Sequence, residues 1–164
     1  MRRAAKTYNF LTTHGIEQYG DLTAKIAEVQ AASGQAAEAL KDVEARLSDM
    51  AVLIKNITTY QKTKPTYDAY RKAKDRGSYR ATHERDIILH EAAAKAIKGA
   101  GISKLPDIAA LQTEYAKLQE RKEALRVDYG RLKKQAGEYD VAKQNIDRIL
   151  RQPKEPQRER ETER

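Results

Sequence analysis

The three histidines are the residues whose type could first suggest metal chemistry or catalysis. His83 and His90 are seven positions apart, so on a helix they share a face but lie two turns apart, about 10 Å along the axis. One metal ion cannot bridge that distance, because each ligand must approach it to about 2 Å. Each precedes a glutamate, as in zinc-protease helices, but the second histidine that such a helix needs four residues later is missing. We therefore predict no metal site, and we expect His14 to close a short helix before Gly15.

Other kinds of active site also lack a candidate. The chain has no cysteine, which excludes thiolate nucleophiles and thiolate metal ligands. Gly99 and Gly101 belong to the exit of a predicted helix and form no phosphate-binding loop. No serine–histidine–aspartate arrangement can be assembled, and carboxylates on helix surfaces normally pair with lysine or arginine. The sequence thus predicts no catalytic residue, no cofactor and no enzymatic activity.

A cluster of positive charge is the strongest functional feature. The net charge is +8, and residues 51–80 contain eight lysines and arginines against two aspartates. Cations neutralise phosphates, and interleaved aromatic rings can stack on unpaired bases. The candidate nucleic-acid-binding residues are Lys55, Lys62, Lys64, Arg71, Lys72, Lys74, Arg76, Arg80, Tyr67 and Tyr70. Two alternatives stay open: a protein partner, or a solvated turn whose tyrosines form a small core.

Two heptad patterns must position this cluster. The first begins at Asp21, alternates steps of four and three, and is apolar at ten of eleven positions, which is typical of a coiled coil. Its positions are Leu22, Ile26, Val29, Ser33, Ala36, Leu40, Val43, Leu47, Met50, Ile54 and Ile57. We expect this helix to end near Lys64, because Pro65 disfavours helical geometry in the residue before it.

The second pattern begins at Asp107 and is apolar or aromatic at eleven of thirteen positions. Its positions are Ile108, Leu111, Tyr115, Leu118, Lys122, Leu125, Tyr129, Leu132, Ala136, Tyr139, Lys143, Ile146 and Leu150. The two lysines are expected to reduce stability and to define the register. Pro153 and Pro156 are expected to stop the helix. The charged tail that follows has no apolar anchor, so we expect it to be disordered.

Short helices are expected before each long one. Residues 66–76 and 79–99 predict two helices separated by a break at Gly77. The dipeptide Gly-Ile, at Gly15 and again at Gly101, precedes each long helix. The glycine can supply the left-handed conformation that ends a helix, while the isoleucine packs back on it. The aspartate that follows each junction is expected to cap the long helix.

The expected fold is all-α, a long antiparallel coiled-coil hairpin with a small helical tip between the arms. Its segments are a short N-terminal helix and junction (1–20), a first arm (21–64), a helical tip (65–106), a second arm (107–151) and a disordered tail (152–164). The arrangement would place Leu22 near Leu150 and Ile57 near Tyr115. A parallel homodimer ranks second, because its tip would have nothing to pack on, so monomer or homodimer stays undecided.

Composition agrees with long helices. Charged residues make up 34% of the 164 residues, with one phenylalanine and no tryptophan, which argues against a thick globular core. No apolar run approaches the roughly 20 residues of a membrane span. The N-terminus has no apolar stretch behind its two arginines, so a secretory signal is not expected. We expect a cytoplasmic protein that does not bind membranes.

Several segments resemble a known family. They are Lys55–Tyr60, Tyr129–Lys134, Glu138–Asp140, Asn145–Asp147 and the two Gly-Ile junctions. Over residues 8–151 the chain is similar to the C-terminal region of relaxases, the mobilisation nucleases of integrative conjugative elements of Firmicutes. Such relaxases nick DNA at a transfer origin through an N-terminal domain with a tyrosine nucleophile and a histidine-bound metal. This chain has no closely spaced histidine cluster, so no catalytic residue carries over.

The resemblance implies a non-catalytic accessory segment of a conjugative DNA-transfer protein. Its implied partners are DNA, at the origin or single-stranded, and other conjugation proteins. Whether the chain is a separate protein or a fragment of a larger relaxase stays open. The alternative function is a coiled-coil scaffold or adaptor for another protein. DNA binding would depend on the cations of the tip, whereas a scaffold would depend on the apolar heptad positions.

Overall fold

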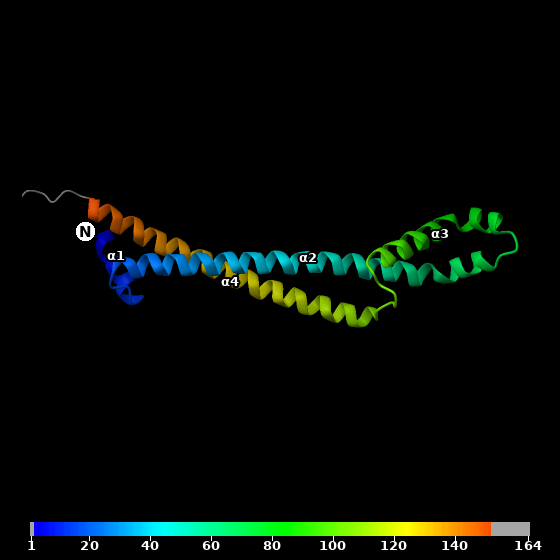
Figure 1. The fold of residues 1–164 in the computed structure, drawn as a ribbon, viewed down its shortest axis with the longest axis horizontal. Helices are drawn as coiled ribbons and strands as arrows, with labels where there is room; N and C mark the ends of the chain where they lie inside the picture. The colour runs from blue at the N-terminus through cyan, green and yellow to red at the C-terminus, as the bar shows by residue number, and fades with distance from the viewer. Residues whose placement is uncertain (1, 152–164) are drawn as a thin grey trace, which may run out of the picture. The chain divides into compact units, whose positions relative to one another are not determined.

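The computed structural model describes residues 2–151, and within that range all of its regular elements are helices (Figure 1). The helices are α1 (Arg2–Thr13), α2 (Tyr19–Lys72), α3 (Arg76–Gly99) and α4 (Ile108–Arg151). The all-α prediction is therefore confirmed for the described residues. The predicted disordered tail, 152–164, lies outside them.

The chain divides into two compact units. The terminal unit combines the chain up to Ala37 with the chain from Val127 onward, and the central unit is Glu38–Arg126. The long helices α2 and α4 each contribute to both units. This division was not expected, because an unbroken heptad pattern gives no signal at its middle.

The core of the terminal unit lies where the start of α2 meets the end of α4. Leu22, Val29 and Tyr139 are buried together there. Partly buried side chains from α1 and its junction complete the cluster, among them Phe10 and Ile16. The short helix thus covers apolar side chains that two helices alone would leave exposed to water.

Both Gly-Ile junctions have the predicted geometry. Gly15 and Gly101 have φ angles of 66° and 76°, in the left-handed region that glycine enters without strain. Ile16 N–H donates to the Leu11 carbonyl at 2.9 Å, and Ile102 makes the equivalent bond five residues back at 3.4 Å. These bonds satisfy carbonyls at the ends of α1 and α3.

The aspartates after the junctions act as helix-start residues in two different ways. Asp107 Oδ1 accepts from Ala109 N–H at 3.2 Å, as predicted for a residue that caps α4. Asp21 instead lies inside the first turn of α2, where its Oδ2 accepts from Gln18 N–H at 3.2 Å. Helix α2 therefore begins at Tyr19, two residues earlier than expected, because the carboxylate of the third helical residue can reach back to the capping position.

The predicted pairing of the arms is offset in the structure. Leu22 packs in a cluster with Ile146, whereas Leu150 is 70% exposed. In the central unit, Tyr115 packs on the cluster that contains Met50. A heptad pattern defines which face of each helix is apolar, but any shift by one heptad satisfies it equally well. The position of one helix along the other is set by the side chains that fill each layer.

The prediction that the first long helix ends near Lys64 is wrong. Helix α2 continues through Pro65 to Lys72, so the separate short helix expected over 66–76 does not exist. Proline removes one backbone hydrogen bond and usually breaks or kinks a helix. Here Thr63 and Tyr67, on either side of the proline, both contact α3 through His90. Packing on the two sides of Pro65 therefore favours a continuous helix.

The chain reverses between α2 and α3, earlier than the break expected at Gly77. Asp75 is the N-cap of α3, and its carboxylate accepts from Ser78 N–H at 3.1 Å and from the Ser78 hydroxyl at 2.8 Å. Gly77 consequently lies in the first turn of α3. Aspartate satisfies the free N–H groups of a helix start, so it decides the position of the turn in place of the glycine.

Candidate nucleic-acid interface

The predicted cations all lie in the central unit, along the last turns of α2, the connection and the start of α3 (Figure 1). We call residues 71–76, which comprise the end of α2, the connection and the first residue of α3, the basic turn. Arg80 is half-buried, and the other seven cations are exposed, namely Lys55, Lys62, Lys64, Arg71, Lys72, Lys74 and Arg76. The structure thus leaves most of the predicted set accessible to a polyanion.

Three of the eight cations already have partners within the protein. Lys64 Nζ lies 2.8 Å from Asp68 Oδ2, and this hydrogen bond raises the pKa of Lys64 above its usual value. Arg80 contacts both carboxylate oxygens of Glu91, at 3.2 and 3.4 Å. Arg76 donates through Nη2 to the Arg71 carbonyl at 2.9 Å. This bond satisfies one of the last carbonyls of α2, which have no donor within the helix.

The remaining five cations are the ones available to a ligand. None of them forms an ion pair with a residue in the described range 2–151. They are Lys55, Lys62, Arg71, Lys72 and Lys74. Three of the five fall within four residues of one another at the basic turn, so their fields add over a short distance.

The tyrosines of the predicted set pack against each other and against histidines. The Tyr67 ring stacks on His90 with centroids 4.4 Å apart, and it also lies 5.9 Å from the Tyr70 ring. The series continues through Tyr79, which lies 6.5 Å from Tyr70 and stacks on His83 at 4.1 Å. These rings form an aromatic column between α2 and α3, so part of the ring surface that an unpaired base would need already contacts a neighbouring ring.

His90 is a central residue of this column. Its side chain is 3% exposed and lies between the rings of Tyr60 and Tyr67. Its Nδ1 is 2.9 Å from the Thr63 hydroxyl, which itself donates to the Thr59 carbonyl at 2.7 Å. A hydroxyl has one proton to donate, so Nδ1 carries the hydrogen and donates to the Thr63 oxygen. Burial lowers the pKa of His90 below its ordinary value of 6.5.

The sequence contained a signal for this buried histidine. Ile87, His90, Ala93 and Ile97 are the buried residues of α3, and their spacing follows one helical face. Histidine is only intermediate in its tendency to be buried, so the residue type alone does not place His90 in the core. The position of His90 on the same helical face as Ile87 and Ile97 indicates that it belongs to the core.

The stability of the central unit should fall as the pH drops through 6.5. In the unfolded chain His90 takes up a proton near its ordinary pKa of 6.5, whereas in the folded protein its pKa is lower. The unfolded state therefore binds more protons in that window, and protonation favours unfolding. The melting temperature should be highest above pH 6.5 and should decrease between about pH 7.5 and about pH 5.5.

A His90→Phe variant should lose this dependence on pH. Phenylalanine can keep the stacking with Tyr60 and Tyr67, and Thr63 still donates to Thr59. His83→Gln is the matched control, because His83 is exposed and should leave the decrease in place. Equal decreases in the parent and in His90→Phe would show that other groups cause it. The charged groups that act on His90 are Asp68, Lys64 and Glu91, and all three are present in both variants.

Comparison with models of protein families, with curated proteins and with solved structures found no match for this chain. Its chemistry must therefore be judged from its own residues. Across residues 2–151, no group of three or more histidine, aspartate or glutamate side chains is arranged to hold a metal ion. Within the same range, no helix combines the length and the apolar character that crossing a bilayer requires.

Proposed function

We propose that this chain is a non-catalytic accessory segment of a conjugative DNA-transfer protein, and that its basic turn contacts the phosphate backbone of DNA. The observation that carries the proposal is the group of exposed cations without ion-pair partners within residues 2–151, at Arg71, Lys72 and Lys74. The resemblance of residues 8–151 to the C-terminal region of relaxases supports the link to DNA transfer.

Contact with phosphates is favoured over the reading of bases. The rings of Tyr67 and Tyr70 are half-buried and stack within the aromatic column. Freeing either ring for a base would break contacts with a neighbouring ring, which are worth about 1 kcal/mol each. Lysine and arginine at the turn require no such change, because they already face water. Binding should therefore depend little on sequence.

The long helices would supply the support for this turn. We propose that the paired segments of α2 and α4 within each unit form an antiparallel coiled coil. In the terminal unit Leu22 and Ile146 share a cluster, and in the central unit Leu47 and Leu118 do. Rising residue numbers in α2 thus match falling numbers in α4, as antiparallel packing requires.

Salt-dependent DNA binding tests the proposal. A labelled duplex of random sequence should bind the full chain with an affinity that falls by about 0.9 log units per phosphate contact for each log unit of salt. Replacing Arg71, Lys72 and Lys74 together by glutamine should lower that slope by about 2.7 and weaken binding to all sequences alike. Fluorescence anisotropy between about 50 and about 200 mM salt measures both quantities.

The matched control removes the same charge from another part of the central unit. Lys95, Lys98 and Lys104 are exposed residues of α3 and the loop after it. Their triple glutamine variant should keep most of the parent's affinity and slope. Equal losses in the two variants would mean that net charge alone attracts DNA, and a parent that does not bind at all would leave the proposal without support.

A scaffold function is the second candidate, and one observation favours it. Three large apolar side chains of the central unit are exposed: Val52, Ile88 and Leu89, by 56%, 49% and 40%. Such residues can mark a protein contact when they lie together. If the parent chain does not bind DNA, a partner protein that covers these side chains becomes the better explanation of the molecule.

A further inference from the structure

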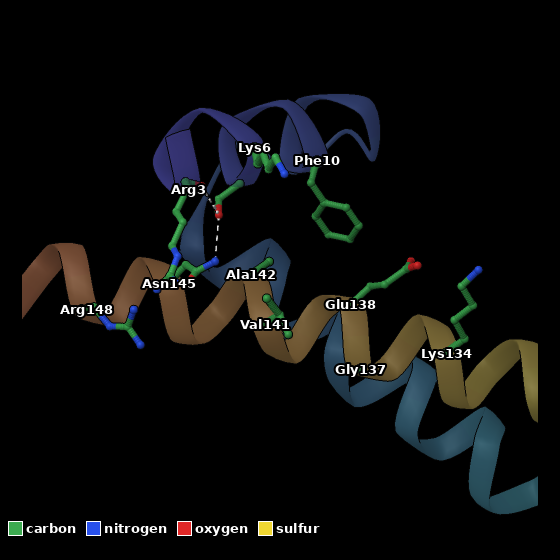
Figure 2. Close-up of a pocket in the computed structure, with 11 residues that line it drawn as sticks. Arg3, Lys6, Phe10, Lys134, Gly137, Glu138, Val141, Ala142, Asn145 and Arg148 are labelled. Carbon is green, nitrogen blue, oxygen red and sulfur yellow. Dashed lines mark hydrogen bonds between the residues drawn. The ribbon is translucent and has the colours of Figure 1, made fainter. Parts of the chain in front are cut away.

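The terminal unit contains a groove between α1 and the last turns of α4 (Figure 2). Its volume is about 830 Å³. Phe10 enters it from α1, and Val141 and Ala142 line it on the α4 side. Val141 is 57% exposed. Gly137 adds bare backbone to the lining, because it has no side chain. The groove therefore presents an apolar floor to water.

A polar contact holds the two walls of the groove together. Asn145 of α4 donates through Nδ2 to the Thr7 hydroxyl of α1 at 3.1 Å. That hydroxyl is buried and donates in turn to the Arg3 carbonyl at 3.0 Å. Phe10 also packs edge-on against Tyr139, with ring centroids 5.4 Å apart. These side-chain contacts fix the position of α1 on α4, and they therefore set the width of the groove.

The rim of the groove is basic. Arg3 and Lys6 come from α1, Lys134 and Arg148 from α4, and all four are exposed. None of the four forms an ion pair with any residue between 2 and 151. Glu138 is the one acidic residue among those that line the groove. Four cations against one carboxylate leave a net charge of +3 around an apolar floor.

We propose that this groove binds an acidic, amphipathic segment of a partner protein. Apolar side chains of the segment would cover Phe10 and Val141, and its carboxylates would pair with the four rim cations. The α4 side of the groove runs from Lys134 to Arg148, about 21 Å at 1.5 Å per residue. A helix of about four turns has that length, so an acidic helix with one apolar face fits the groove.

Nucleic acid fits this groove less well than a peptide does. The apolar floor offers nothing to a phosphate backbone, and Glu138 acts alike on phosphates and on carboxylates, so the apolar floor is what separates the two ligands. In a peptide helix, by contrast, the apolar face and the acidic residues can be placed on opposite sides. The site is independent of the proposed DNA contact, which lies in the central unit.

A peptide-display selection tests the proposal. The full chain serves as the immobilised bait, and the library displays peptides of about 14 residues. The enriched sequences should combine aspartate or glutamate with apolar residues at helical spacing. Binding of the best synthetic peptide should weaken at least about tenfold when Lys6 and Lys134 are changed to glutamate. The control changes Arg2 and Lys133 to glutamate, which alters the same two helices by the same charge outside the groove, and it should bind as the parent does.

A second variant fills the groove without disturbing the fold. A Cβ at Gly137 would meet no atom within 4 Å, so Gly137→Leu has room, and leucine is a better helix former than glycine. It should keep or raise the melting temperature and reduce peptide binding at least about tenfold, as expected for a blocked hot spot. A Cβ at Gly130 on the same helix would also meet no atom within 4 Å, and Gly130 lies outside the groove, so Gly130→Leu should leave binding unchanged.

Three results would overturn the proposal. The first is a selection that enriches no peptide, or enriches peptides without acidic residues. The second is a selected peptide that binds the groove variants and the parent equally. The third is a single-stranded oligonucleotide that binds the parent and competes with the peptide, but does not bind the Lys6/Lys134 variant. That result would identify the groove as a nucleic-acid site.

Discussion

Replacing Tyr139 by alanine should lower the free energy of unfolding of the terminal unit by about 3 to 5 kcal/mol, the usual cost of removing a large buried aromatic ring. The side chain is 1% exposed and lies in the cluster with Leu22 and Val29. Its ring also meets the rings of Phe10 and His14, at 5.4 and 5.6 Å. Alanine would leave a cavity at the point where α1, α2 and α4 meet. Denaturant unfolding followed by helical circular dichroism measures the loss.

Tyr139→Phe is the matched control for this change. The ring makes the contacts with Phe10 and His14 and packs in the core cluster, so the ring should account for most of the stability. Phenylalanine should therefore cost less than about 1 kcal/mol. A loss in the phenylalanine variant as large as that in the alanine variant would mean that the hydroxyl, through water, is the important group.

Replacing Pro65 by alanine should raise the free energy of unfolding of the central unit by about 1 to 3 kcal/mol. Pro65 lies inside α2, where proline costs about 3 kcal/mol relative to alanine. Alanine would restore a backbone N–H that can donate to the Gln61 carbonyl, four residues back. The gain is reduced by up to about 1 kcal/mol, because proline also restricts the unfolded chain. Chemical denaturation of the two proteins measures the difference.

Lys62→Ala is the control for the proline substitution. Lys62 is exposed and lies one turn earlier on α2, so its replacement should change stability by less than about 0.5 kcal/mol. If Pro65→Ala is destabilising, the bend that proline imposes must be needed for the contacts of Thr63 and Tyr67 with α3. That outcome would reverse our account of why the helix continues through the proline.

The aromatic column shows how tertiary contacts change the reading of a sequence cluster. Tyr67 and Tyr70 stand among cations in the sequence, which is the arrangement expected of a surface that stacks on bases. In the structure they lie between helices and contact His90 and Tyr79. A pattern of residue types cannot tell whether a ring faces a ligand or a neighbouring helix, because both environments select the same amphipathic side chain.

The groove on α1 and α4 was not predicted, and its residues explain why. Arg3 and Lys6 are more than 120 positions from Lys134 in the sequence. Helix α1 carries only cations, and α4 carries charges of both signs, so neither helix alone indicates a groove. The packing of α1 on α4, through Thr7 with Asn145 and Phe10 with Tyr139, brings the four rim cations to one site. Charge counted along the chain therefore found the basic turn, which is local, and missed the basic groove, which is not.

The helical class, the apolar faces of the two long helices and the left-handed helix ends could be predicted from the sequence. Each of these features depends on residues within a few turns of one another, as at Gly15 and Gly101. Tertiary structure alone decided the continuation of α2 through Pro65, the burial of His90 and the offset of Leu22 from Leu150. The reason is energetic: a local preference of about 3 kcal/mol, such as that of proline against a helix, is outweighed when the side chains on both sides of it are held by contacts with another helix.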